Sequence, residues 1–147
     1  MRKVVILLIA LTLGAAAFAW VGCGGGGTGA DTPEGVVEAF LSASVEGDAD
    51  AAFKLITTAD QDRFTNKEDL VEGFTTGVEG YEVGPATISG DTARVPVSFQ
   101  LAGLEQDFEF DMIVVDEAGA WRISISASDV EVEAAMNKLM EEVNPPE

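Results

Sequence analysis

Three carboxylates at alternate positions could hold a metal ion or take part in proton transfer. Asp107, Glu109 and Asp111 are spaced two residues apart, and hard cations such as Ca²⁺ bind several oxygen ligands of this type. On an extended strand, side chains two residues apart are separated by about 7 Å, because each residue rises about 3.4 Å. One ion cannot bridge that span without loop ligands. We therefore expect a solvated outer face, partly neutralised by Arg94 and Arg122 on neighbouring strands.

Composition narrows the chemistry further. The 147 residues include no histidine and one cysteine. The chain therefore lacks the commonest general base and metal ligand, and it cannot form an internal disulfide or a thiolate metal cluster. Eight Lys and Arg stand against 26 Asp and Glu, giving a formal charge of −18. This acidity argues against nucleic-acid binding, which needs clustered cations. We predict no metal site, no cofactor and one folded domain.

The first 22 residues predict a secretory signal peptide. Arg2 and Lys3 form a positive start, residues 4–13 are apolar apart from one threonine, and small residues follow. This three-part layout is typical of signal peptides. An uncleaved membrane helix over residues 4–21 is the alternative, since 18 uncharged residues lie at the lower limit for a bilayer span.

The signal peptide ends in Trp-Val-Gly-Cys at residues 20–23. This motif resembles the lipobox of bacterial lipoproteins, in which a lipid is attached to the cysteine thiol and the peptide is cut before it. The resemblance implies lipid attachment at Cys23, and hence a cell-envelope protein anchored on the extracytoplasmic side of the cell membrane. Residues 23–31 are rich in glycine and predict a flexible tether.

Three helices are expected at the start of the folded domain. Thr32 is a favourable N-cap for the first, and Gly47 marks its end. Asp48 can cap the second helix and Asn66 the third. Between these two, residues 59–65 predict a loop or a single turn, whose acids serve as helix caps or loop charges.

After residue 80 the hydrophobic period changes from about 3.6 to 2, which predicts four strands in an antiparallel meander. We expect them over residues 81–89, 92–101, 106–116 and 121–126. Gly84 and Pro85 interrupt the first strand, which indicates a bulge or an edge position. The alternation makes one face of the sheet apolar and the other polar.

A C-terminal amphipathic helix and tail are predicted over residues 128–147, capped by Ser128 or Asp129. Its apolar stripe consists of Val132, Met136, Leu139 and Val143. We expect this stripe to pack on the body of the domain. A second copy of the chain or a protein partner is the alternative.

Four segments within residues 32–127 resemble NTF2-like lipoprotein domains. They are T-P-E-G-V-V-E-A-F-L at 32–41, E-G-D-A-D-A-A-F-K-L-I at 46–56, G-D-T-A-R-V-P-V at 90–97 and G-A-W-R-I at 119–123. These domains include a bacterial envelope family of unknown function near the lumazine-binding group. The resemblance implies an α+β cone: three N-terminal helices packed on a curved four-stranded antiparallel sheet around an apolar cavity. The C-terminal helix is less typical of the family.

Some proteins with the cone fold are isomerases, dehydratases or epoxide hydrolases. The absence of histidine excludes a dehydratase that depends on this residue. Arg94 with Asp107 and Asp111 has the residue types of the hydrolase group, but the strand alternation places these side chains on the outer face. Tyr81, the only phenol, is expected as a wall or rim residue. We therefore predict no catalytic residues.

Six aromatic residues are the candidates to line a hollow cone: Phe40, Phe74, Tyr81, Phe99, Phe110 and Trp121. A filled core is the alternative, which the sequence does not exclude. Two functions remain open. One is a non-catalytic module that binds a small apolar ligand. The other is an interaction lipoprotein that docks a protein partner, or forms a homodimer, through the outer sheet face or the C-terminal helix.

Overall fold

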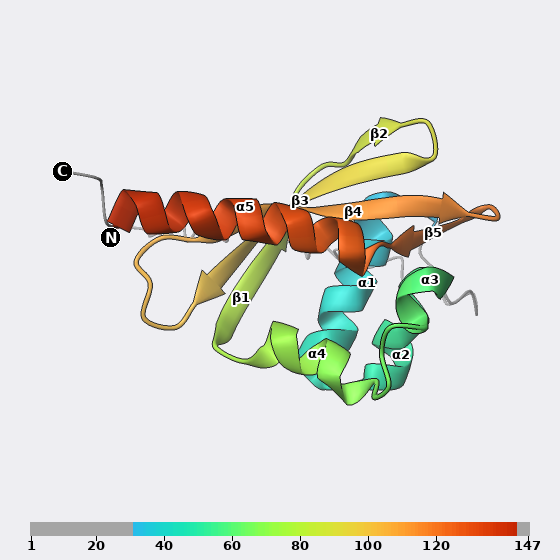
Figure 1. Cartoon of the computed structure of the whole chain (residues 1–147), viewed down its shortest axis with the longest axis horizontal. Coiled ribbons are helices and arrows are strands. Elements are labelled where there is room, and N and C mark those ends of the chain that lie inside the picture. Colours follow the sequence, from blue (N-terminus) through green and yellow to red (C-terminus); the bar gives the residue numbers. More distant parts are fainter. Residues whose placement is uncertain (1–30, 144–147) are drawn as a thin grey trace, which may run out of the picture.

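The computed structural model describes residues 31–143 (Figure 1). The predicted signal peptide, Cys23 and the glycine-rich tether up to residue 30 lie outside the described residues. The helices are α1 (Pro33–Glu46), α2 (Ala49–Phe53), α3 (Thr58–Gln61), α4 (Glu68–Thr75) and α5 (Ile125–Val143). The strands are β1 (Val78–Val83), β2 (Thr87–Ser89), β3 (Thr92–Leu101), β4 (Phe108–Glu117) and β5 (Ala120–Ile123). None of the described helices combines the length and apolar character needed to cross a membrane.

Local sequence signals set the bounds of α1 and α2, as predicted. The Thr32 side chain accepts a hydrogen bond from the backbone N–H of Gly35. Asp48 accepts one in the same way from Ala51. Gly47 ends α1 with a φ of 75°, a conformation that glycine adopts without steric cost.

The predicted cap of the third helix is wrong. The helix α4 follows Lys67, which makes no side-chain cap. The Asn66 amide instead donates to the Asp69 carboxylate in the first turn. With an acid at that position, Asn66 acts as a side-chain donor rather than as an acceptor for backbone N–H groups. The predicted single turn before this helix is α3.

The sheet is antiparallel, in the order β1-β3-β4-β5, and β2 also pairs with β3. The predicted first strand is therefore split into β1 and β2, which makes five strands rather than four. The break lies at Gly84, where an added Cβ would stand 2.8 Å from Cγ of Pro96. The edge position is confirmed. A register shift also occurs between Val78 and Gly80, before the predicted start of this strand rather than at Gly84 and Pro85.

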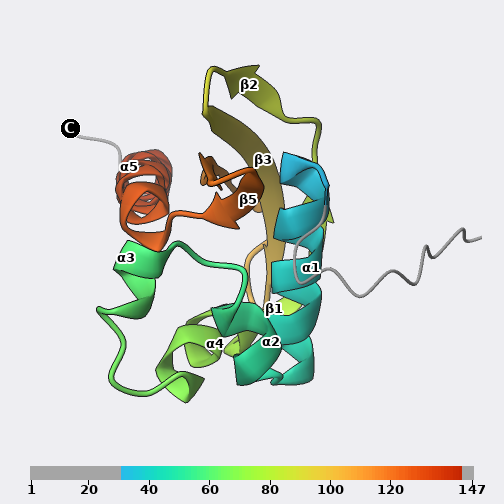
Figure 2. The same cartoon turned by 90° about the vertical axis from the view of Figure 1, so that its right-hand side faces the viewer.

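Helices cover both faces of the curved sheet (Figure 2). The helices α1, α2 and α4 lie on one face, called the inner face here. The helix α5 crosses the opposite, outer face. On the inner face, Val36 and Phe40 of α1 pack in one core with Val95, Val114 and Ile123 of the sheet. This is the α+β arrangement predicted from the sequence, with helices packed on a curved antiparallel sheet and a C-terminal helix (Figure 2).

The start of α5 differs from the prediction. The helix begins at Ile125 and follows Ser124, whose side chain accepts a hydrogen bond from the third helical N–H. Neither Ser128 nor Asp129 is the cap. The Ser128 hydroxyl instead donates to the Ser124 carbonyl (2.7 Å) and accepts from the N–H of Ile113 on β4 (2.9 Å). Ile125 is buried in the helix, and it would also be buried if the strand continued. The alternation of apolar and polar residues therefore could not show where the strand ends and α5 begins.

Candidate functional site

The N-terminus of α5 is held by a buried carboxylate that comes from α3. Asp60 is 1% exposed and accepts hydrogen bonds from the N–H groups of Ile125 (2.8 Å) and Ser126 (3.2 Å). The Thr57 hydroxyl (2.8 Å) and the Arg63 guanidinium (3.0 Å) also donate to it. Helix N-terminal N–H groups lack intrahelical partners and carry partial positive charge. The Asp60 carboxylate supplies both the missing hydrogen-bond acceptor and a compensating negative charge.

The pKa of Asp60 reflects two opposed effects. Burial alone raises the pKa, but hydrogen bonds from Thr57, Arg63 and Ser126 outweigh burial and hold the pKa below its ordinary value. The carboxylate is therefore charged at neutral pH. The sequence identified this acid as a helix cap or loop charge, but the helix that it caps lies 65 residues further along the chain.

A second contact ties the middle of α5 to the sheet. The Arg94 guanidinium on β3 lies 2.8 Å from Glu131 on α5 and 3.4 Å from Asp111 on β4. Both acids raise the pKa of Arg94, Glu131 most strongly. Arg94 and Asp111 are therefore on the outer face, as predicted, and away from α1.

The other outer-face residues only partly follow the prediction. Asp107 accepts a hydrogen bond from Ser98 at 3.2 Å. Arg122 forms no ion pair within the described residues, because its cross-strand neighbour is Val115 rather than an acid. Its predicted neutralising role is wrong. Within residues 31–143, no three side chains of His, Cys, Asp or Glu converge to hold a metal ion.

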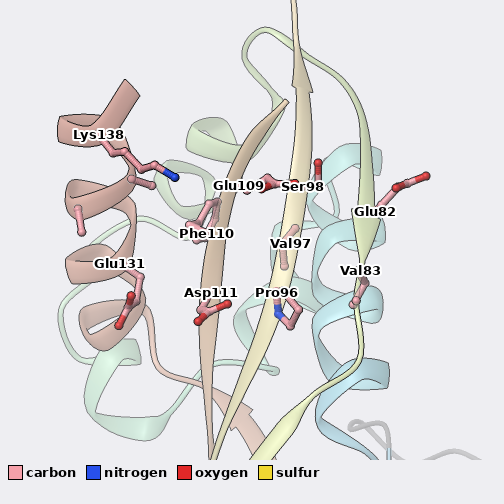
Figure 3. Close-up of a pocket in the computed structure, with 13 residues that line it drawn as sticks. Glu82, Val83, Pro96, Val97, Ser98, Glu109, Phe110, Asp111, Glu131 and Lys138 are labelled. Carbon is pink, nitrogen blue, oxygen red and sulfur yellow. The ribbon is translucent and has the colours of Figure 1, made fainter. Parts of the chain in front are cut away.

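Beyond the Arg94 contact, α5 and the sheet enclose an open groove of about 570 Å³ (Figure 3). Its apolar lining includes Val83, Pro96 and the small residues Ala134 and Ala135. Charged residues line it as well: Glu82, Glu109, Asp111, Glu131 and Lys138. A second hollow of about 520 Å³ continues towards the β3–β4 loop and shares Glu109, Ala135 and Lys138 with the first. We call the two together the α5 groove.

The helix α5 packs on the body of the domain, as predicted, but only part of the predicted stripe takes part in the packing. Of that stripe, Val132 and Leu139 are half-buried and Met136 is 47% exposed; the side chain of Val143 is not described. The sheet-facing positions include Ser128, buried against β4, and Ala135. Small side chains at such positions leave the space that forms the α5 groove.

Six α5 residues line the groove, and among them only Leu139 belongs to the predicted stripe. They are Glu131, Ala134, Ala135, Lys138, Leu139 and Glu142. Their spacing of three and four residues could have indicated a helix face. Apart from Leu139, that face contains small and charged residues, so a search for apolar stripes does not identify it as a binding face.

The six aromatic candidates pack in or against the inner core, and one of them, Phe110, also lines the α5 groove (Figure 3). Phe40 meets Phe74 edge to face at 5.0 Å, and Phe99 stacks on Phe110 at 5.6 Å. Phe40 has no accessible surface, so no water-sized space touches it. The sixth, Trp121, is partly buried against the core. The structure thus brings three pairs of these residues together, the third being Tyr81 with Phe99, and ligand binding by the set stays a prediction.

Tyr81 lines a separate hollow between α1 and β1, together with Glu34, Glu38 and Pro85. Burial raises the pKa of the Tyr81 phenol, and the charge of Glu38 raises it further. Its ring also lies 6.4 Å from that of Phe99. The residue therefore stands at the rim of the core, as predicted.

Comparison with solved structures finds several matches. A SEC-C motif containing protein from Rhodopseudomonas palustris is similar over 65% of this chain and 77% of its own, with 19% identity and a TM-score of 0.53. A Campylobacter jejuni protein described as an NTF2-like transpeptidase covers 64% of this chain and 98% of its own, with 16% identity and a TM-score of 0.44. An LEH-like epoxide hydrolase from M. tuberculosis covers 76% and 94%, with 16% identity and a TM-score of 0.35. No protein-family model and no curated protein matches the chain.

Proposed function

We propose that this protein is a lipid-anchored, extracytoplasmic and non-catalytic module that docks a segment of a partner protein in the α5 groove. The groove itself carries the proposal. Its volume of about 570 Å³ lies in the range of ligand sites, which combine an apolar lining with a few polar groups. Val83, Pro96 and Ala135 supply the apolar lining here, and charged side chains surround them.

The groove is also formed by ordered secondary-structure elements. Strands β3 and β4 form its floor, and α5 forms one side. Asp60 fixes the start of α5, and the contact of Arg94 with Glu131 fixes its middle. A site whose walls are already ordered loses less conformational freedom when a partner binds.

The inner face is filled, and this supports a docking site on the outer face. Phe40, Val95 and Met112 have no accessible surface, which indicates a filled core between α1 and the sheet. Every fully buried side-chain nitrogen and oxygen within the described residues has a hydrogen-bond partner. That part of the cone therefore offers neither space nor free polar groups to a ligand.

Membrane attachment through Cys23 belongs to the same proposal. The variant Cys23→Ser removes the thiol that would carry the lipid, so the protein should leave the membrane fraction or accumulate as an uncut precursor. A mature Cys23→Ser protein that stays in the membrane fraction would contradict lipid anchoring.

Photo-crosslinking in living cells tests the docking role. We would introduce p-benzoylphenylalanine at Ala134, in the groove, and at Glu72, an exposed position of α4 on the other face. We expect a discrete adduct from position 134 alone, mapped to one segment of one partner. The adduct should disappear when Ser98→Trp fills the groove. No adduct at position 134, or the same adducts from both positions, would contradict the proposal.

A small apolar ligand at the wide end of the cone is the second candidate. Phe74, Phe108 and Phe110 are only partly buried on the inner side, so this end is less closed than the rest. Native mass spectrometry of the gently purified full chain would detect such a ligand as an added mass that is lost on denaturation. An unmodified native mass would remove this candidate.

A further inference from the structure

We infer that the α5 groove accepts an extended segment of the partner that has lysine or arginine at alternate positions and apolar side chains between them. This inference rests on the proposed docking function and names the chemistry of the occupant. Three features support it: the charge of the groove, the spacing of its acids and its apolar lining.

The charge of the groove is strongly negative. Seven carboxylates line it, against one lysine, Lys138. They belong to Glu82, Glu105, Asp107, Glu109, Asp111, Glu131 and Glu142. Arg94 neutralises two of them, Asp111 and Glu131. Within the described residues, the other five form no ion pair, so a cationic partner would complement them.

The spacing of the acids favours an extended partner. Asp107, Glu109 and Asp111 occupy alternate positions at the start of β4 and line the groove. Their side chains repeat about every 7 Å along the outer face. An extended peptide lying beside β4 has the same repeat, so cations at every second residue would meet the unpaired Asp107 and Glu109, whereas Asp111 already pairs with Arg94. Adjacent cations would project to opposite sides of such a peptide, and only part of them could reach the acids.

The apolar lining separates this site from a purely ionic surface. Val83 and Pro96 lie on the strand side of the groove, and Ala134, Ala135 and Leu139 lie on the helix side. Side chains between the cations of the partner can therefore bury apolar surface there.

Other occupants fit less well. A second copy of the chain would bring the same carboxylates to the groove, and the whole chain has a formal charge of −18. Anionic lipid headgroups would be repelled for the same reason. These occupants are negative outcomes of the test below.

The test is fluorescence anisotropy on the full chain in phosphatidylcholine nanodiscs, with empty nanodiscs as the blank. The probes are three labelled hexapeptides. In the first, lysine alternates with alanine and valine; the second has glutamate in place of lysine; the third has the first composition with the lysines adjacent. We expect binding of the first, on the order of tenfold weaker binding of the third, and no binding of the glutamate peptide.

A charge-matched pair of variants locates the binding. Glu82→Gln, Glu105→Gln and Glu109→Gln together remove three unpaired acids of the groove. Glu68→Gln, Asp69→Asn and Glu72→Gln remove three acids of α4, on the other face. We expect the groove variant to bind the first peptide on the order of tenfold more weakly, and the α4 variant to bind as the wild type does. All six residues are exposed, so both variants should fold.

Three results would overturn the inference: equal binding of the alternating and adjacent lysine peptides, equal weakening by both variants, or binding of the glutamate peptide. A partner segment without basic residues, crosslinked at position 134, would also overturn it while leaving the docking function intact. Failure of that crosslink would instead remove the docking function itself. Dimer formation that is blocked by Ser98→Trp would assign the groove to a second copy.

Discussion

The two faces of the sheet differ in how they are covered. On the inner face, α1 packs apolar side chains directly against β3, β4 and β5, and Val36, Val95 and Ile123 have no accessible surface. On the outer face, α5 contacts the sheet through Ser128 and Glu131 and leaves the α5 groove beyond Arg94. One face therefore serves stability, and the other has space for a partner.

The difference follows from the kinds of side chain that meet on each face. Large apolar groups on α1 fill the distance to the sheet, and such burial stabilises the fold. On α5, small and charged residues face the strands, so the helix is positioned by a few polar contacts. Because a few polar contacts position α5, the groove beneath this helix can stay unfilled while the inner core remains packed.

The largest expected effect concerns two neighbours on β3 that point to opposite faces. Phe99 is buried and stacks on Phe110, whereas Gln100 is exposed. We expect Phe99→Ala to lower the free energy of unfolding by about 3–5 kcal/mol, and Gln100→Ala to change it by about 0.5 kcal/mol or less. Urea unfolding measures both. Similar costs for the two variants would remove the distinction between the faces.

The next effect concerns the anchor of α5. Asp60→Ala leaves buried donors without an acceptor, so we expect a loss of about 2–3 kcal/mol in the free energy of unfolding. Amide hydrogen exchange in the first turns of α5 should also accelerate. The control is Asp62→Ala, an exposed acid one residue beyond α3, which should change neither quantity. Unchanged exchange in the Asp60 variant would show that the cap does not hold the helix.

The pH dependence of stability gives a second test of the Asp60 cap. The pKa of Asp60 is lowered in the folded state, so its contribution to stability is present above its unfolded pKa of about 3.9. That contribution is lost as the pH falls through the lower, folded pKa. The difference in unfolding free energy between wild type and Asp60→Asn should therefore be largest near neutral pH and shrink below about pH 4. A difference that stays constant down to pH 2 would contradict this assignment.

The smallest expected effect on stability comes from the exposed contact in the middle of α5. Arg94→Gln removes the ion pairs with Asp111 and Glu131, and solvent-exposed pairs contribute little to folding. We expect a urea midpoint close to that of the wild type, with faster amide exchange confined to α5. Exchange that is faster across the whole sheet would mean that the outer face contributes to the core.

Local signals in the sequence predicted most of the fold. The caps at Thr32 and Asp48 and the alternation of β3 depend on residues close together in the chain, and the structure confirms them. The start of α5 and its cap could not be predicted, because Asp60 is remote in sequence from Ile125. The α5 groove was missed because it depends on which helix face meets the sheet, and most α5 residues that line the groove are small or charged.

The most direct test of the account is an NMR titration of the full chain, in phosphatidylcholine nanodiscs, with the alternating lysine peptide. Amide signals report which face of the sheet the peptide contacts. We predict that shifts concentrate at Glu109, Ala135 and Lys138 in the groove, with Phe40 and Phe74 unchanged. Shifts centred on Phe40 and Phe74, with the groove signals unmoved, would contradict the assignment of the outer face as the binding face.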